Sequence, residues 1–364
     1  KPSLDQINPF LGLLVDDLLE FWEPGVWFSR TAKSTSRHLV RAALVPLICD
    51  VVGARQVVGL GAHSSKYFCS FCLLKSQDIE NFDISTWPRR TAHDHLRNAE
   101  RWRDASSAEE RGKIFEDHGV RWSELLRLPY WDSIKYTVVD SMHNLYLGLI
   151  KTHCRNVWGI DFNIEGGDAS AHPNKPPPLQ PSSDDMKAGT HALYYKSLSA
   201  LSKCSKAEAF ASIHEVHESM QLPSWINPVP RGFGTTKHGK LSADQWHTAC
   251  MTLLPVALVL LWGNETERKL RMLENFMDLA TAVVLAGMWS ISEAHIELFE
   301  MYLRKYLEGL KELYKEAKIV PNHHLALHLP DFMRLFGPVH SWRSFVFERF
   351  NYILQHMNTN LTFG

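Results

Sequence analysis

Two cysteines close together in the sequence are the first residues that could do chemistry. Cys69-Ser-Phe-Cys72 has the Cys-x-x-Cys spacing of a metal knuckle or of a redox pair. A thioredoxin-like redox pair needs a strand before the motif and a helix that begins inside it, and the flanking Lys-Tyr-Phe and Leu-Leu-Lys segments are closer to a zinc knuckle. Because two thiolates do not fill a tetrahedral site, a zinc ion would require two more ligands.

A histidine pair far along the chain can supply those ligands. In the segment 322–328, His324 and His328 are four residues apart, so on a helix they would share one face. Alone, this spacing is more typical of core or surface histidines. Together with the unfinished cysteine pair, it favours one zinc ion held by Cys69, Cys72, His324 and His328.

Two acids form a second candidate constellation. Asp50 ends the apolar run 38–50, which we interpret as a buried strand, although Pro46 removes a backbone donor. Glu348 is the only acid in the aromatic, apolar run 345–351, and a buried acid needs a partner or a metal. The structural alternative for Glu348 is an ion pair with a neighbouring arginine.

Composition limits the class of protein. The chain has 364 residues, of which 45% are apolar and 22% charged, and this allows a substantial core and about one to three domains. The net charge of −1 leaves only local patches to contact nucleic acid. Six cysteines with a single Cys-x-x-Cys fit a reducing compartment better than a disulfide framework. The longest apolar run, 251–262, is too short to span a bilayer and predicts a buried helix.

Periodicity places these motifs on elements. The expected elements are an amphipathic helix at 8–22, a short helix or turn at 53–61, polar helices at 78–128, an extended piece at 135–139, a helix from about Asp140, a linker at 164–186 and mostly helix at 187–318. The linker is predicted from its Gly-Gly, Pro-Pro-Pro and Ser-Ser pairs. Asp140 is expected to cap the helix that follows it.

Several blocks carry a resemblance to a known family. The blocks are residues 2–8 with 14–22, 63–72, 121–132 with 140–148, and 322–351. They resemble the transposases of CACTA elements, especially the Plavaka-like lineage of basidiomycete fungi, over nearly the whole chain. The wider superfamily, which includes the Transib transposases and the V(D)J recombinase, uses an Asp-Asp-Glu triad on an RNase H-like fold.

The resemblance implies roles for the candidate residues. Asp50 would be the second catalytic Asp and Glu348 the catalytic Glu, both binding Mg²⁺ or Mn²⁺, while the Cys-x-x-Cys and the histidine pair would bind a structural Zn²⁺. It also implies a nuclear protein that acts on transposon ends and target DNA, with no membrane partner and with homo-oligomers as an option. A DNA-backbone patch is expected at Arg89, Arg90, Arg97, Arg101 and Arg103, although a solvated helix face explains these arginines equally well.

The sequence also departs from the family pattern. The first catalytic Asp is expected upstream of Lys1, because it lies on a strand that precedes the helix at 8–22, so we expect this chain to be inactive alone. Asp5, Asp16 and Asp17 are poor substitutes, since each lies in or beside that helix. Val51-Val-Gly stands where the family resembles Leu-Pro-Ala, which affects the loop after Asp50.

The expected fold class is an α/β, RNase H-like core that lacks its first strands and carries a large helical insertion, so that the chain is predominantly α. The expected domains are a partial core at 1–75, the insertion at 76–318, and a return to the core at 319–364. The expected function is metal-dependent cleavage and strand transfer of DNA. Two alternatives are a catalytically dead relic or domesticated DNA- or protein-binding module, and a zinc-stabilised helical scaffold.

Overall fold

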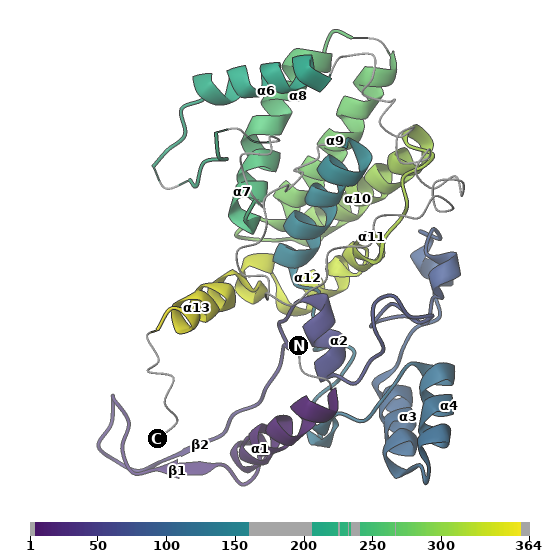
Figure 1. Ribbon diagram of the computed structural model, residues 1–364. Helices are drawn as coiled ribbons and strands as arrows, with labels where there is room; N and C mark the ends of the chain where they lie inside the picture. The colour runs from purple at the N-terminus through teal and green to yellow at the C-terminus, as the bar shows by residue number, and fades with distance from the viewer. Residues whose placement is uncertain are drawn as a thin grey trace, which may run out of the picture. The chain divides into compact units, whose positions relative to one another are not determined.

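The chain divides into two compact units. The computed structural model describes residues 4–159, 206–224, 226–231, 233, 241–265 and 267–357. The first unit contains residues 1–141 and 319–364, and the second contains 142–318. Helices dominate both units (Figure 1), in agreement with the expected predominance of α structure.

Short elements build the first unit. They are α1 (Leu4–Trp22), β1 (Val26–Phe28), β2 (His38–Val40), α2 (Val51–Val57), η1 (Ser76–Asp78), η2 (Ile84–Thr86), α3 (Ala92–Asp104), α4 (Ala108–His118), η3 (Glu124–Arg127), α11 (Pro321–Ala326), α12 (Leu329–Phe336), η8 (Val339–Trp342) and α13 (Phe345–Gln355). Among the described residues, the strands form one antiparallel pair, in which Trp27 lies opposite Leu39.

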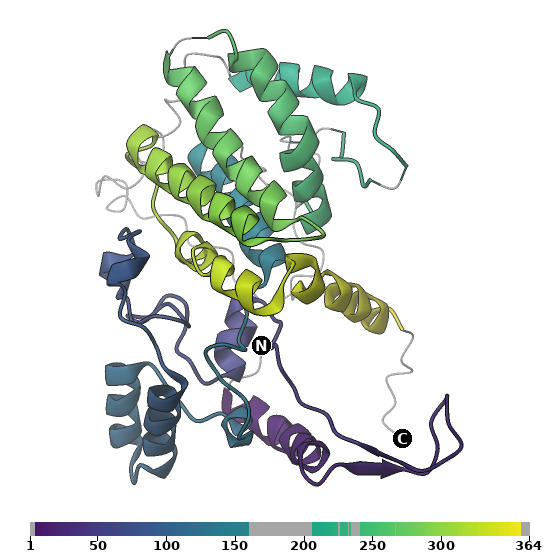
Figure 2. The same ribbon diagram turned by 180° about the vertical axis from the view of Figure 1, so that it is seen from behind.

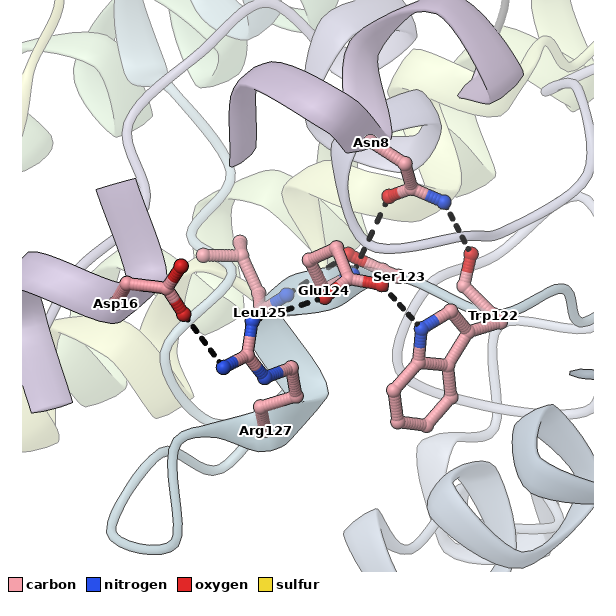
Figure 3. Close-up of polar contacts among 7 residues, drawn as sticks. All are labelled: Asn8, Asp16, Trp122, Ser123, Glu124, Leu125 and Arg127. Atoms are coloured by element: carbon pink, nitrogen blue, oxygen red, sulfur yellow. Dashed lines mark hydrogen bonds and ion pairs between the residues drawn. The ribbon is translucent and has the colours of Figure 1, made fainter. Parts of the chain in front are cut away.

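Helix α1 is the amphipathic helix expected from the sequence, and it packs on the turn at η3. Val15 is fully buried in a core that includes Val58, Trp122 and Leu125. Figure 3 shows the polar contacts beside it: the Asn8 side chain donates to the Trp122 carbonyl (3.1 Å) and accepts from the Glu124 amide (3.2 Å). A side chain that serves two backbone groups fixes the position of the helix relative to the turn.

The buried strand expected at residues 38–50 is not present in that form. Only His38–Val40 is a strand, and its residues are exposed or half-exposed. Further on, Leu47 forms one parallel bridge to Thr137, with Leu47 donating to the Tyr136 carbonyl (2.7 Å). The prediction of a continuous strand is wrong because Pro46 has no N–H to give to a ladder.

The first unit is larger than the sequence suggested. The polypeptide leaves it after Ser141 and returns at Ile319, whereas the insertion was expected to begin at residue 76. Residues 76–141 stay in the first unit because Leu128 and Trp131 are buried in the same core as Val58. The boundary therefore follows tertiary packing, which the local polar pattern of 78–128 did not reveal.

The second unit is a group of helices around an aromatic core. Its described elements are η4 (Met142–Ile150) and η5 (His153–Val157), which have π-type turns, then α6 (Lys206–Ser219), α7 (Ala243–Thr248), η7 (Ala249–Leu253), α8 (Leu254–Trp262), α9 (Glu267–Ala286) and α10 (Glu293–Leu313). Helices α9 and α10 lie side by side (Figures 1 and 2). The Asn275 amide donates to the Tyr306 carbonyl (2.8 Å) between them. The linker expected at 164–186 lies outside the described residues.

Elements α7, η7 and α8 form one continuous apolar helix. It spans Ala243–Trp262, and it alone among the described helices is long and apolar enough to cross a membrane by length and composition. Half of its apolar window is buried inside the structure, and core helices of soluble proteins pass the same test. The predicted helix at 251–262 is therefore the second half of a longer, half-buried helix.

We expect Gly59→Ala to destabilise the first unit strongly. Gly59 has φ +79°, and an added Cβ would collide with the Arg121 carbonyl. Left-handed backbone alone costs a non-glycine residue roughly 1–2 kcal/mol, and the collision adds to this. The expected loss of unfolding free energy is about 2–4 kcal/mol, measured by urea unfolding with circular dichroism.

Gly112→Ala is the matched control for this substitution. Gly112 lies in α4, and a Cβ there meets no atom within 4 Å. Alanine in a helix interior is favoured over glycine by roughly 0.5–1 kcal/mol, so this variant should be slightly more stable than the original chain. Equal effects of the two substitutions would contradict the backbone argument.

Candidate metal centre

The four residues that the sequence predicts as ligands of one zinc ion lie close together in the structure. Cys69 Sγ lies 3.4 Å from His328 Nε2, and Cys72 Sγ lies 3.3 Å from His324 Nε2. The two Nε2 atoms are 3.3 Å apart, and all four ligand atoms lie within 4.8 Å of one another. A tetrahedral zinc site, with Zn–S about 2.3 Å and Zn–N about 2.0–2.1 Å, has ligand-to-ligand edges of about 3.3–3.8 Å. The buried Cys₂His₂ cluster could therefore hold a metal such as zinc.

The histidines keep their helical spacing across a break between two helices. His324 lies on α11, and His328 is the residue before α12, with helical backbone angles. Pro330 follows in the first turn of α12. Proline is tolerated there because the N–H groups of the first helical turn have no hydrogen-bond partner within the helix. The four-residue spacing thus survives, as the sequence predicted, although the helix does not run straight through it.

His323, the residue before His324, has a different task. Its Nδ1 accepts a hydrogen bond from the Val320 amide (3.1 Å), so the side chain caps the start of α11. Burial lowers the pKa of His323 to about 4, and the imidazole is neutral at physiological pH. The choice of His324 over His323 as the ligand therefore agrees with the geometry.

Aromatic rings enclose the cluster. Trp87 stacks on the His324 ring at 4.2 Å between centroids, and Phe68 meets the same ring edge-on at 4.7 Å. Phe71 lies 5.0 Å from the His328 ring. These rings keep water from the ligand atoms, and a lower local dielectric strengthens the interaction of thiolates with a cation.

A carboxylate orients His328. Asp331 Oδ2 lies 4.0 Å from His328 Nδ1 and 3.3 Å from Arg89 Nη1. The nearby His328 ring lowers the pKa of the Asp331 carboxyl, and the charge of Arg89 adds to this effect. A carboxylate on the outer nitrogen directs the other nitrogen, Nε2, at a metal.

Arg55 holds the cysteine loop from inside and was not anticipated from the sequence. It is 1% exposed, and its guanidinium donates to the carbonyls of Gly61 (2.6 Å) and Tyr67 (2.7 Å). Burial lowers its pKa to about 10, and the nearby Cys69 charge opposes that shift. The available signal was a lone arginine inside the apolar run 51–60, where a buried cation needs nearby acceptors.

The Cys69 thiol is electrically prepared for a cation. Burial raises the pKa of the Cys69 thiol, but its hydrogen bond with Cys72 and its contacts with His328 and His324 outweigh burial, and the net shift is well below the ordinary value. A thiolate is the form that binds zinc, because metal binding displaces the thiol proton.

The expected DNA patch does not form one free basic surface. Arg90 is buried, and its Nε donates to the Cys69 carbonyl (3.3 Å), so it supports the cysteine loop. The other four arginines each bond to a neighbouring side chain: Arg89 to Asp331, Arg97 to Asp94, Arg101 to Asn98 and Arg103 to Asp104. The carboxylates offset the charges of Arg89, Arg97 and Arg103, whereas the partner of Arg101 is a neutral amide.

The two candidate catalytic acids lie in the first unit on separate elements. Asp50 is half-buried and caps α2, with Oδ1 accepting from the Gly53 amide (2.5 Å). Glu348 lies in the first turn of α13 and is exposed, so the interpretation of Glu348 as a buried acid is wrong. The reason is that the apolar side chains of α13, such as Phe347 and Phe350, are themselves half or more exposed.

Asp140, which lies near Cys49 as Asp50 does, is hydrogen-bonded to the start of α13. Its buried carboxylate accepts hydrogen bonds from the Ser344 amide (2.7 Å) and the Ser344 hydroxyl (2.7 Å), across 204 residues of sequence. Ser344 immediately precedes α13, so Asp140 fixes the beginning of the helix of Glu348. Burial, with the charges of Asp50 and Asp140 added, raises the pKa of Cys49 to about 11, which places both acids near that thiol.

Comparison with known proteins assigns no family. No family model matches the chain, and no curated protein matches its sequence. The function is therefore inferred from the site residues and their placement.

We expect the folded chain to bind about one zinc per molecule, and Cys69→Ser or His324→Ala to lose most of it. Loss of a structural zinc removes several kcal/mol of stability, so the melting temperature should fall by at least about 5 °C. Metal content by mass spectrometry and differential scanning calorimetry measure both effects. Cys49→Ser, a cysteine outside the cluster, should keep its zinc. Full zinc binding by Cys69→Ser would exclude the four-ligand site.

We expect Asp140→Ala and Ser344→Ala to be strongly coupled. Hydrogen bonds to a charged group contribute roughly 1.5–3 kcal/mol, and here two of them share a buried carboxylate. A double-mutant cycle on unfolding free energy should give a coupling above about 1 kcal/mol. The exposed pair Asp94 and Arg97 is the control, with an expected coupling of about 0.3–0.5 kcal/mol. Additive effects of Asp140→Ala and Ser344→Ala would contradict this role of Asp140.

Proposed function

We propose that this chain is a fragment of a DDE-type DNA transposase of the CACTA kind, which cleaves transposon ends and transfers the freed strand to target DNA. One observation carries the proposal: Cys69 and Cys72 meet His324 and His328 across 252 and 259 residues of sequence. This is the long-range linkage that the resemblance implies. The same order puts Asp50 before the cysteines and Glu348 after the histidines.

The zinc in this proposal is structural. Four protein ligands complete a tetrahedral shell, so no position remains for a reactive water. The ion would fasten the segment that returns at Ile319 to the cysteine loop of the same unit. Asp140 then fixes the next stretch, because it holds Ser344 at the start of α13.

Asp50 and Glu348 would bind the catalytic Mg²⁺ or Mn²⁺. Such ions, in pairs about 4 Å apart, activate the attacking oxygen and stabilise the leaving oxygen of a phosphodiester. Carboxylate oxygens are the ligands these hard cations prefer. The exposure of Glu348 supports this role, since a ligand shared with a DNA phosphate must be reachable from solvent.

An RNase H-like core belongs to the proposal as well. The parallel bridge between Leu47 and Thr137 supports it, because Asp50 and Asp140 each follow that bridge by three residues. Carboxyl ends of adjacent parallel segments meet at one edge, where ligands commonly bind. Of the described residues, only the Cys₂His₂ cluster forms a group of three or more potential metal ligands, so we place the third catalytic carboxylate outside them.

We expect little or no magnesium- or manganese-dependent nicking of element-end DNA by the chain as given, and nicking by a version extended upstream in frame. In the extended version, Glu348→Gln should reduce nicking by about a hundredfold or more, because small changes in catalytic geometry cost that much. Glu297→Gln, an exposed acid of α10, is the matched control and should keep full activity.

Two results would contradict this proposal. Nicking that survives Glu348→Gln would remove Glu348 from the active site. A folded, zinc-loaded extended protein with no metal-dependent nicking would remove the transposase function while leaving the zinc centre intact.

A further inference from the structure

The β1–β2 hairpin is a separate feature of the first unit. It follows the end of α1, and its loop extends away from that helix (Figures 1 and 2). The strands pair from Val26↔Val40 to Phe28↔His38, and Thr31 and Ser34 bridge the loop. All residues from Trp27 to Leu39 are exposed, apart from the half-exposed Ser34. The hairpin is therefore a surface element.

The hairpin is strongly basic in a chain that is nearly neutral. Between Pro24 and Cys49 the sequence contains no Asp or Glu and four basic residues: Arg30, Lys33, Arg37 and Arg41. The whole chain has a net charge of −1. Positive charge is thus concentrated on one exposed ribbon, which is the electrostatic pattern of a polyanion-binding surface.

These cations differ from those of α3 in their partners. In the part of the chain that the structure describes, Arg30, Lys33 and Arg37 form no ion pair. Arg97 and Arg103, by contrast, are each 2.7 Å from a carboxylate oxygen. A phosphate can therefore approach the hairpin cations without first displacing a carboxylate.

The two faces of the hairpin have different surroundings. Phe28 points back to α1, where its ring lies 6.3 Å from that of Phe21. Trp27 and Leu39 lie opposite each other on the other face and are 54% and 42% exposed. The Arg37 guanidinium lies over the Trp27 ring at 4.8 Å. The outer face thus combines cations with one flat aromatic ring.

We propose that this outer face of the hairpin binds the backbone of duplex DNA. A two-stranded ribbon fits the major groove, and arginine, lysine and hydroxyl side chains supply most protein–phosphate contacts. The loop residues 29–36 carry Ser and Thr between the cations and no large apolar side chain. A membrane-inserting tip would need such side chains, so the chemistry favours DNA over an anionic lipid surface.

The proposal rests on the proposed function for its choice of DNA, but its test requires no cleavage. Binding of a fluorescent duplex of about 30 base pairs is measured by anisotropy over a salt series, with the full zinc-loaded chain. The triple variant Arg30→Gln, Lys33→Gln, Arg37→Gln should bind about tenfold or more weakly near 0.1 M salt. Its slope of log K against log salt should fall by about 2–3, because each lost phosphate contact releases about 0.9 fewer counterions.

The matched control removes the same charge from α3. Arg97→Gln, Arg101→Gln, Arg103→Gln should bind within about threefold of the original chain, because these side chains already have partners. Trp27→Ala should weaken binding by a few-fold and leave the salt slope unchanged, since an aromatic contact releases no counterions. Both variants should keep the original melting temperature.

Three results would overturn the proposal: unchanged DNA binding by the hairpin triple variant, an equal loss in the α3 triple variant, or hairpin-dependent binding to phosphatidylserine vesicles without DNA binding. Failure here is distinct from failure of the proposed function. An extended chain that nicks DNA normally with a neutral hairpin would remove only this surface. Hairpin-dependent DNA binding by the extended chain, without any nicking by it, would keep the surface and remove the transposase.

Discussion

The convergence of two thiols and two imidazoles is the constraint on which the first unit depends. The cysteine loop has little regular structure, and helices α11 and α12 are only six and eight residues long. Segments of this size do not hold their position by helix propensity alone. Their order comes from a shared centre, enclosed by Trp87 and Phe68 and supported from behind by the buried guanidinium of Arg55. Helix α11 and the start of α12, which follow Ile319, meet the cysteine loop at this centre.

Long-range polar links complete this arrangement. Asp140 binds the serine before α13, and Asn8 ties α1 to the turn at Glu124. Each link uses one side chain to satisfy backbone groups of a segment more than a hundred residues away. A buried carboxylate such as that of Asp140 has few alternative partners, so it selects one register for the element it holds. Glu348, one of the acids proposed for catalysis, lies in the first turn of the helix that the Asp140 link positions.

Local spacing predicted part of this structure. The apolar repeat of α1 and the intervals in Cys69-x-x-Cys72 and His324-x₃-His328 are short-range patterns, and each corresponds to an observed element or group. The prediction of a strand at 38–50 was wrong beyond Val40. A sequence rich in Val, Ile and Leu indicates apolar surroundings but does not show that the backbone has a hydrogen-bonding partner. The structural role of Arg55 and the distant partner of Asp140 were missed for the same reason. Their partners lie in loops and segments that only tertiary folding brings near.

The separation of the ligands also affects how the protein is made. The two cysteines leave the ribosome long before the two histidines, because Cys72 and His324 are separated by 252 positions in the sequence. At about 5–20 residues per second, this interval lasts roughly 10–50 s. During that time the whole second unit is synthesised and free to fold, while the thiols of the first unit lack half of their ligand set. The nascent chain therefore carries a two-cysteine site that remains open to other metals and to oxidation until His324 and His328 emerge.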